Sequence, residues 1–149
     1  MSTHSYSRCW LHLIWETLRR ERMLDKYAGA RASKFLYEYS AEKGIYLKIN
    51  YFNADHTHVL IDLPTNYCVE DVIHLFKGAH HIGLTRTSSL EENSRGKGYG
   101  AFSVSHSDVG RVAAYIANQE EHHRKKTFAE EFELFVRLYG LKWREERNR

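Results

Sequence analysis

The stretch ADHTHVLIDLP, residues 54–64, predicts a β-strand that carries two histidines on one of its faces. Successive side chains of a strand point to opposite faces, so His56 and His58 lie on one face and Thr57 lies on the other. The Thr57 face is the better core face, because apolar residues such as Ile61 continue it. We therefore expect the two imidazoles to lie on the more open surface of the sheet.

Turn residues before this strand and Pro64 after it make it the second strand of a hairpin. Working outward, apolar residues at alternating or helical spacing predict the remaining elements. Strands are expected at 10–17, 45–51, 56–63 and 101–105, and helices at 25–43, at 69–84, from 107 onward, and from 127 to about 140. This order predicts one α+β domain over residues 1–149: a ferredoxin-like (RRM-like) β-α-β-β-α-β antiparallel sheet with helices on one face, plus C-terminal helices.

Two local patterns refine these elements. The hairpin partner at 45–51 alternates as a strand with one buried face does. A capping-box pattern at Thr127 and Glu130 predicts the start of the last helix. The residues expected on the buried face of the hairpin partner are Ile45, Leu47, Ile49 and Tyr51.

The composition is that of an ordinary globular protein, with 42% hydrophobic and 28% charged residues. A formal charge of +3 permits an anionic partner but does not demand one. No run of about 18 apolar residues is present, so we expect no membrane span. The cysteines, Cys9 and Cys68, form no CxxC pattern, and no signal peptide is recognisable, which favours a reduced, cytoplasmic protein.

Two histidines at positions i and i+2 of a strand can share one metal ion, because their rings project from the same face. The alternative is a pair of surface histidines that bind nothing. On the helix predicted from residue 107, the apolar stripe leaves Tyr115 and Gln119 one turn apart on a polar edge. A tyrosine at such an edge is also typical of an amphipathic side chain without a catalytic role. Spacing alone leaves both choices open.

Taken together, these segments resemble the single-tyrosine HUH transposases of small bacterial insertion sequences, the insertion-sequence-200-like family. DHTHVLIDLP (residues 55–64) is similar to their histidine motif, and GYGAFSVS (98–105) to their last strand. YIANQEEHH (115–123) is similar to their tyrosine helix. The likeness runs from about His12 to Gly140, and the combination of motifs is specific although each motif alone is not.

The resemblance implies a catalytic site. His56, His58 and Gln119 would hold a divalent metal ion, Mg²⁺ or Mn²⁺. Tyr115 would be the nucleophile that attacks a DNA phosphodiester, leaving a 5′-phosphotyrosine link and a free 3′-hydroxyl. Attack on a phosphodiester needs charge neutralisation and in-line positioning, which a metal ion and a fixed tyrosine supply. The implied activity is metal-dependent cleavage and rejoining of single-stranded DNA during transposition.

The resemblance also implies partners. The family binds DNA hairpins at the ends of its elements and works as a homodimer, in which one subunit's tyrosine helix can complete the other's metal site. We expect hairpin binding and a homodimer here, in a bacterial or archaeal cytoplasm, and the sequence leaves open whether the tyrosine helix acts within one subunit or across two. Basic side chains in loops and at helix ends suit a phosphate track, although each taken singly also fits a solvated surface. The candidates are Arg19, Arg20, Lys77, Arg95, Lys97 and Arg111.

Two other functions compete with this interpretation. A domesticated protein that binds DNA hairpins without transposing would keep the fold, but it has no need of a metal-and-tyrosine set. A replication initiator or relaxase of the same superfamily usually carries extra domains or a different motif order. The metal-dependent transposase is therefore the leading hypothesis.

Overall fold

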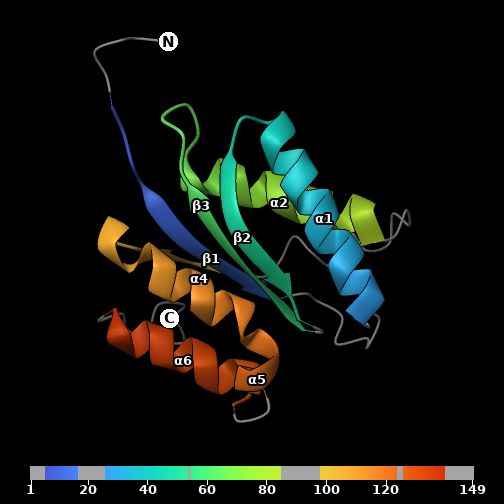
Figure 1. Ribbon diagram of the computed structural model, residues 1–149, viewed down its shortest axis with the longest axis vertical. Coiled ribbons are helices and arrows are strands. Elements are labelled where there is room, and N and C mark those ends of the chain that lie inside the picture. The colour runs from blue at the N-terminus through green and yellow to red at the C-terminus, as the bar shows by residue number, and fades with distance from the viewer. Residues whose placement is uncertain (1–5, 17–25, 54, 85–97, 124–125, 140–149) are drawn as a thin grey trace, which may run out of the picture. The chain divides into compact units, whose positions relative to one another are not determined.

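The computed structural model describes residues 6–16, 26–53, 55–84, 98–123 and 126–139. Its contacts divide the chain into two compact units, residues 1–117 and 118–149, and each is described by itself. The first unit contains a four-stranded sheet with helices (Figure 1). In its described residues, the second contains the helices α5 (Gln119–His123) and α6 (Phe128–Leu138).

The sheet consists of β1 (Trp10–Glu16), β2 (Tyr46–Phe52), β3 (His56–Asp62) and β4 (Tyr99–Ser103), in the spatial order β2-β3-β1-β4. Every neighbouring pair is antiparallel. Helix α1 (Lys26–Glu42) connects β1 to β2, and helix α2 (Val69–Leu84) follows β3 along the chain. This arrangement confirms the predicted ferredoxin-like α+β fold. The last strand begins two residues earlier than predicted, at Tyr99 rather than Ala101.

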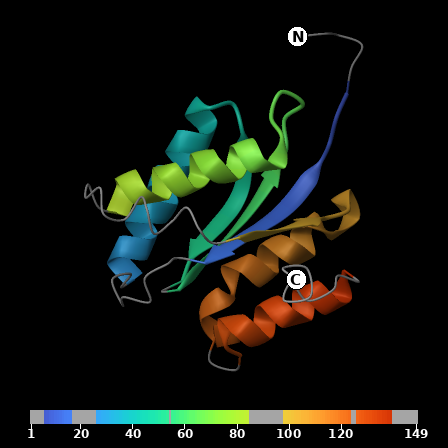
Figure 2. The same ribbon diagram turned by 180° about the vertical axis from the view of Figure 1, so that it is seen from behind.

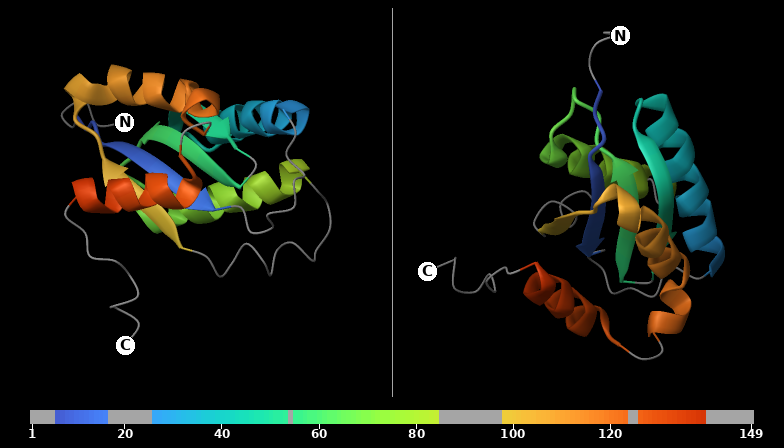
Figure 3. Two further views of the ribbon diagram at one scale, coloured as in Figure 1. Left: turned by 90° about the horizontal axis from the view of Figure 1, so that it is seen from below. Right: turned by 60° about the vertical axis from the view of Figure 1, so that its left-hand side comes forward.

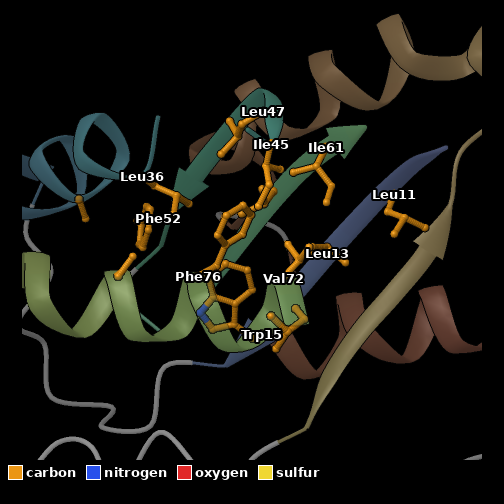
Figure 4. Close-up of a cluster of buried hydrophobic side chains, with 14 residues drawn as sticks. Leu11, Leu13, Trp15, Leu36, Ile45, Leu47, Phe52, Ile61, Val72 and Phe76 are labelled. Carbon is orange, nitrogen blue, oxygen red and sulfur yellow. The ribbon is translucent and has the colours of Figure 1, made fainter. Parts of the chain in front are cut away.

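Helices α1 and α2 pack on one face of the sheet, and Figure 2 shows α2 crossing in front of the strands. The core between them is drawn in Figure 4, where Trp15 and Phe76 lie among aliphatic side chains with ring centroids 6.4 Å apart. Leu13, Val59 and Phe76 are fully buried. Burial of one such side chain contributes about 1.5–3 kcal/mol, so this cluster is the main source of stability of the first unit.

The opposite face of the sheet is covered by helix α4 (Val109–Ala117), which follows a short 3₁₀ turn, η1 (His106–Asp108). Figure 3 (left) shows α4 and α2 on opposite sides of the strands. Val109 and Ile116 of α4 are buried against Trp10 and Leu60. The face that carries His56 is therefore not the open surface expected from sequence. The strand pattern ranks its two faces by polarity, but it does not reveal that a later helix packs on the more polar one.

Strand β2 contains a bulge that reverses its side-chain alternation. Leu47 pairs with Ile61, whereas Ile49 pairs with Leu60, so β2 advances two residues while β3 advances one. One extra residue sends the following side chains to the other face. Leu47 thus joins the cluster under α1 and α2, while Ile49 and Tyr51 pack on the α4 side. The prediction that these three residues share one buried face is wrong, because sequence alternation does not reveal a bulge.

A glycine ends helix α1, and a threonine caps the start of helix α6, as the chemistry of each residue predicts. Gly44 has a φ of +74°, and the bonds Gly44 N–H to Ala41 C=O and Ile45 N–H to Ser40 C=O close a Schellman motif after α1. In the second unit, the Thr127 hydroxyl accepts a hydrogen bond from the Glu130 N–H at 3.2 Å and caps α6. Among the helices that the structure describes, none has both the length and the apolar character of a transmembrane span.

Candidate functional site

Strand β3 places His56 and His58 on the sheet face that α4 covers. Both side chains are fully buried, and their ring centroids are 4.9 Å apart with the planes at 74°. Between them, Thr57 is buried on the other face, as predicted. Imidazole nitrogens bind a metal at about 2.0–2.1 Å, so two rings this close can share one ion. The i, i+2 spacing therefore produces the geometry that a two-histidine metal site requires.

A third histidine, His12 of β1, completes this cluster, and sequence reasoning missed it as a site residue. His12 Nε2 lies 2.8 Å from His58 Nδ1 in a buried hydrogen bond, and the two rings stack with centroids 5.0 Å apart. Register explains the contact: His58 lies opposite Ile14, and His12 lies two residues along the same face of β1. A histidine within an apolar strand indicates a candidate site residue, but the contact of His12 with His58 follows only from the register of β1 against β3.

His56 is held from the hairpin turn. Its Nδ1 lies 2.6 Å from the Asp55 Oδ1 carboxylate oxygen, and its Nε2 lies 3.1 Å from the Asn53 side-chain nitrogen. The Asn53 backbone N–H also donates to the His56 carbonyl at 2.8 Å and closes the hairpin. The turn residues therefore orient the first histidine of the motif as well as reversing the chain.

Helix α4 places Tyr115 against the histidines. The Tyr115 ring packs edge-on to His58 with centroids 5.9 Å apart, and edge-on to His12 at 6.3 Å. The side chain is half-buried, on the edge of the cluster that holds Ile116. The first unit thus brings together the predicted tyrosine and both predicted histidines, although they come from segments far apart in sequence.

Gln119 does not continue the tyrosine helix. Helix α4 ends at Ala117, and α5 begins at Gln119, the first helical residue of the second unit. Asn118 interrupts the helix, and its carbonyl accepts the Glu121 N–H at 3.1 Å. Asparagine is favoured at the cap that precedes a helix. The expectation that one continuous helix carries both Tyr115 and Gln119 is therefore wrong.

The basic candidates are divided. Arg111 is exposed on α4, where its guanidinium lies 3.9 Å from the Asp108 carboxylate. Lys77 is half-buried on α2, and desolvation lowers its pKa. The two residues lie on helices that cover opposite faces of the sheet. The remaining candidates, Arg19, Arg20, Arg95 and Lys97, lie outside the described residues.

Comparisons with known proteins converge on one description. A family profile described as "Transposase IS200 like" matches residues 5–119. The crystal structure of a proposed transposase from Deinococcus radiodurans is similar, with 21% identity, a TM-score of 0.58, and coverage of 80% of this chain and 96% of that one. A REP-associated tyrosine transposase bound to a REP hairpin is similar at 11% identity and a TM-score of 0.53, over 83% of this chain and 74% of that one. A search of curated proteins gives no match.

Proposed function

This chain belongs to the IS200-like transposase family, and on that premise we propose that it is a metal-dependent transposase that cleaves and rejoins single-stranded DNA. The observation that carries the proposal is the contact of Tyr115 with His58, whose ring is 4.9 Å from that of His56. A binding surface has no need to bury two imidazoles beside a tyrosine. A transposase that stores the strand end on a tyrosine needs both.

In the proposed reaction, the Tyr115 oxygen attacks the phosphorus of a DNA phosphodiester and loses its proton. A bond forms between that oxygen and phosphorus, and the bond to the 3′-oxygen breaks. The 3′-oxygen takes up a proton and leaves as a 3′-hydroxyl, while the 5′-phosphate stays on Tyr115. Because the phosphotyrosine retains the energy of the broken bond, a 3′-hydroxyl can later reverse the step and rejoin DNA without a nucleotide cofactor.

We propose that His56, His58 and Gln119 hold the divalent cation, Mg²⁺ or Mn²⁺. The amide oxygen is a ligand that Mg²⁺ and Mn²⁺ favour, and three protein ligands leave positions for phosphate oxygens. When bound, the cation supplies charge neutralisation and orientation of the phosphate. The buried histidine pair of the first unit supports two of these ligands. The third rests on the likeness of YIANQ (residues 115–119) to the family motif, and it can come from the same subunit or from a partner.

The DNA substrate we propose is a single strand that folds into hairpins at the ends of the element. The REP-associated relative bound to a hairpin supports this substrate class. We propose a homodimer of the 149-residue chain as the working form. Arg111 and Lys77, with Arg19, Arg20, Arg95 and Lys97, are proposed to contact backbone phosphates.

A hairpin-binding protein that no longer transposes is the second candidate, because the REP-associated relative is seen in complex with a hairpin. One assay separates the two. Labelled single-stranded DNA from the ends of the element is incubated with the protein and Mn²⁺, and then with added chelator. The transposase predicts cleavage that the chelator abolishes, with a 3′-hydroxyl end that a DNA polymerase can extend. Hairpin binding without cleavage at any tested metal concentration would favour the binding protein.

A further inference from the structure

Both histidines of the proposed metal site contact a protein group through the same ring atom. His56 Nδ1 lies 2.6 Å from the Asp55 carboxylate, and His58 Nδ1 lies 2.8 Å from His12 Nε2. Partners of this kind fix which nitrogen carries the proton and how the ring is turned. The question is therefore which nitrogen each histidine presents to a cation.

For His56 the answer follows from the chemistry of its neighbours. An ionised carboxylate only accepts hydrogen bonds, so the Asp55 contact places a proton on His56 Nδ1. The Asn53 amide nitrogen lies 3.1 Å from His56 Nε2, and an amide N–H can donate only to a nitrogen with a lone pair. Both contacts agree on one tautomer, with the proton on Nδ1 and the lone pair on Nε2. A cation that binds His56 Nε2 takes the place of the Asn53 amide N–H, whose side chain then turns away.

For His58 the contact with His12 allows two arrangements. If His12 Nε2 carries the proton, then His58 carries its own on Nε2 and cannot bind a cation there. If His58 Nδ1 carries the proton, then His12 Nε2 accepts it, and His58 Nε2 has the lone pair. His58 Nδ1 cannot be the ligand atom in either case, because His12 occupies its direction at 2.8 Å.

We propose that His12 is a positioning residue that accepts the His58 Nδ1 proton, so that His12 and Asp55 make both histidines present Nε2 to one cation. This inference rests on the proposed metal site. His12 is suited to the role because it is buried and comes from the neighbouring strand β1, and because its ring stacks on that of His58. Loss of an outer hydrogen-bond partner typically costs a metal site about 10–100-fold in affinity.

The tautomers are measured directly in the metal-free protein by ¹H–¹⁵N correlation of the histidine side chains at a pH where the rings are neutral. The proposal predicts the proton on Nδ1 in His12, His56 and His58. A proton on Nε2 of His58 would overturn it.

A second experiment compares Mn²⁺ affinity among variants of one position by calorimetry. His12→Gln keeps an acceptor oxygen near the position of Nε2, whereas His12→Phe keeps a ring but removes the acceptor. The proposal predicts an affinity about 10–100-fold lower for His12→Phe and near wild type for His12→Gln. Equal losses in the two variants would mean that His12 only packs, and unchanged affinity in His12→Phe would exclude any role.

Asp55 gives the same comparison in a position that tolerates change, because its side chain is 47% exposed. Asp55→Ala removes the acceptor for His56 and should also lower Mn²⁺ affinity, even if His12→Phe does not fold. Failure of the proposed function looks different: the wild-type protein would bind no Mn²⁺ and cut no DNA, whatever its tautomers. Failure of this inference leaves wild-type binding intact and changes only the tautomers or the ranking of variants.

Discussion

The Tyr115 ring packs edge-on against the His58 ring, with the two centroids 5.9 Å apart. The tyrosine comes from α4 and the histidine from β3, and both belong to the first unit. The proposed nucleophile and two of the proposed metal ligands are therefore held together by the sheet and one helix. Each proposed role on this sheet face can therefore be tested by comparing a substitution of the residue with a substitution of a neighbour that has no proposed role.

Tyr115→Phe should abolish DNA cleavage, by more than about 10³-fold in rate, because it removes the attacking oxygen and keeps the ring. Hairpin affinity should stay unchanged. Tyr51→Phe is the matched control, since Tyr51 lies opposite His58 in the register of β2 and β3. It should cleave at the wild-type rate in a gel assay with end-labelled DNA. Equal rates for wild type and Tyr115→Phe would remove Tyr115 from the reaction.

Adjacent residues of β3 should respond in opposite ways. His56→Ala should lower Mn²⁺ affinity measured by calorimetry, because it removes a proposed ligand. Thr57→Val should leave that affinity unchanged, because Thr57 faces the core under α1 and α2. Among the described residues, the buried Thr57 hydroxyl has no hydrogen-bond partner. Replacing it by a methyl group should therefore raise the free energy of unfolding by about 1 kcal/mol. Mn²⁺ binding that is stronger in His56→Ala than in Thr57→Val would contradict the ligand assignment.

Two helical glycines differ in the space around them, and comparing them tests how closely α1 packs on the sheet. A Cβ added to Gly78 of α2 meets nothing within 4 Å, so Gly78→Ala should stabilise the protein by about 0.5–1 kcal/mol. A Cβ added to Gly29 of α1 would lie 3.2 Å from the Phe52 carbonyl oxygen, which is backbone and yields little. Gly29→Ala should therefore destabilise the protein. Chemical denaturation measures both, and stabilisation by Gly29→Ala would mean that α1 lies further from β2.

The salt dependence of hairpin binding tests the proposed phosphate contacts. A side chain that contacts a phosphate contributes about one to the slope of log affinity against log salt concentration. Arg111→Gln should weaken binding and reduce that slope by about one. Lys77→Gln tests the same proposal for the helix on the opposite face of the sheet, and it should also reduce the slope by about one. An unchanged slope removes the substituted residue from the DNA interface.

Local patterns predicted most of this fold. The periodicity of apolar residues predicted the observed bounds of α2, Val69–Leu84. Alternation predicted β3 at 56–63, one residue longer than the observed His56–Asp62. These signals succeed because each strand or helix buries its own face against the core. The sequence did not predict the bulge at Lys48. An inserted residue does not change which residues are apolar, but it changes the face of the sheet to which they point. The sequence also did not predict the break at Asn118, because asparagine is tolerated within a helix as well as favoured at a cap.

The candidate site was predicted only in part. His56, His58 and Tyr115 carry local motifs, and the structure brings them together. His12 carries no motif, and its hydrogen bond to His58 depends on the register of β1 against β3, which pairs Ile14 with His58. The spacing of residues within one segment cannot predict contacts that depend on the register between distant strands. The contact of His56 with Asp55, in contrast, joins two adjacent residues.

The central claim is that Tyr115 forms a covalent link with DNA. The most direct measurement incubates the protein with Mn²⁺ and single-stranded DNA from the ends of its element, denatures the mixture in SDS, and locates the bound nucleotide by peptide mass spectrometry. The claim predicts one tryptic peptide that carries a 5′-phosphorylated nucleotide on Tyr115, and no adduct in Tyr115→Phe. A covalent adduct on any other residue, or an adduct that persists in Tyr115→Phe, would contradict it.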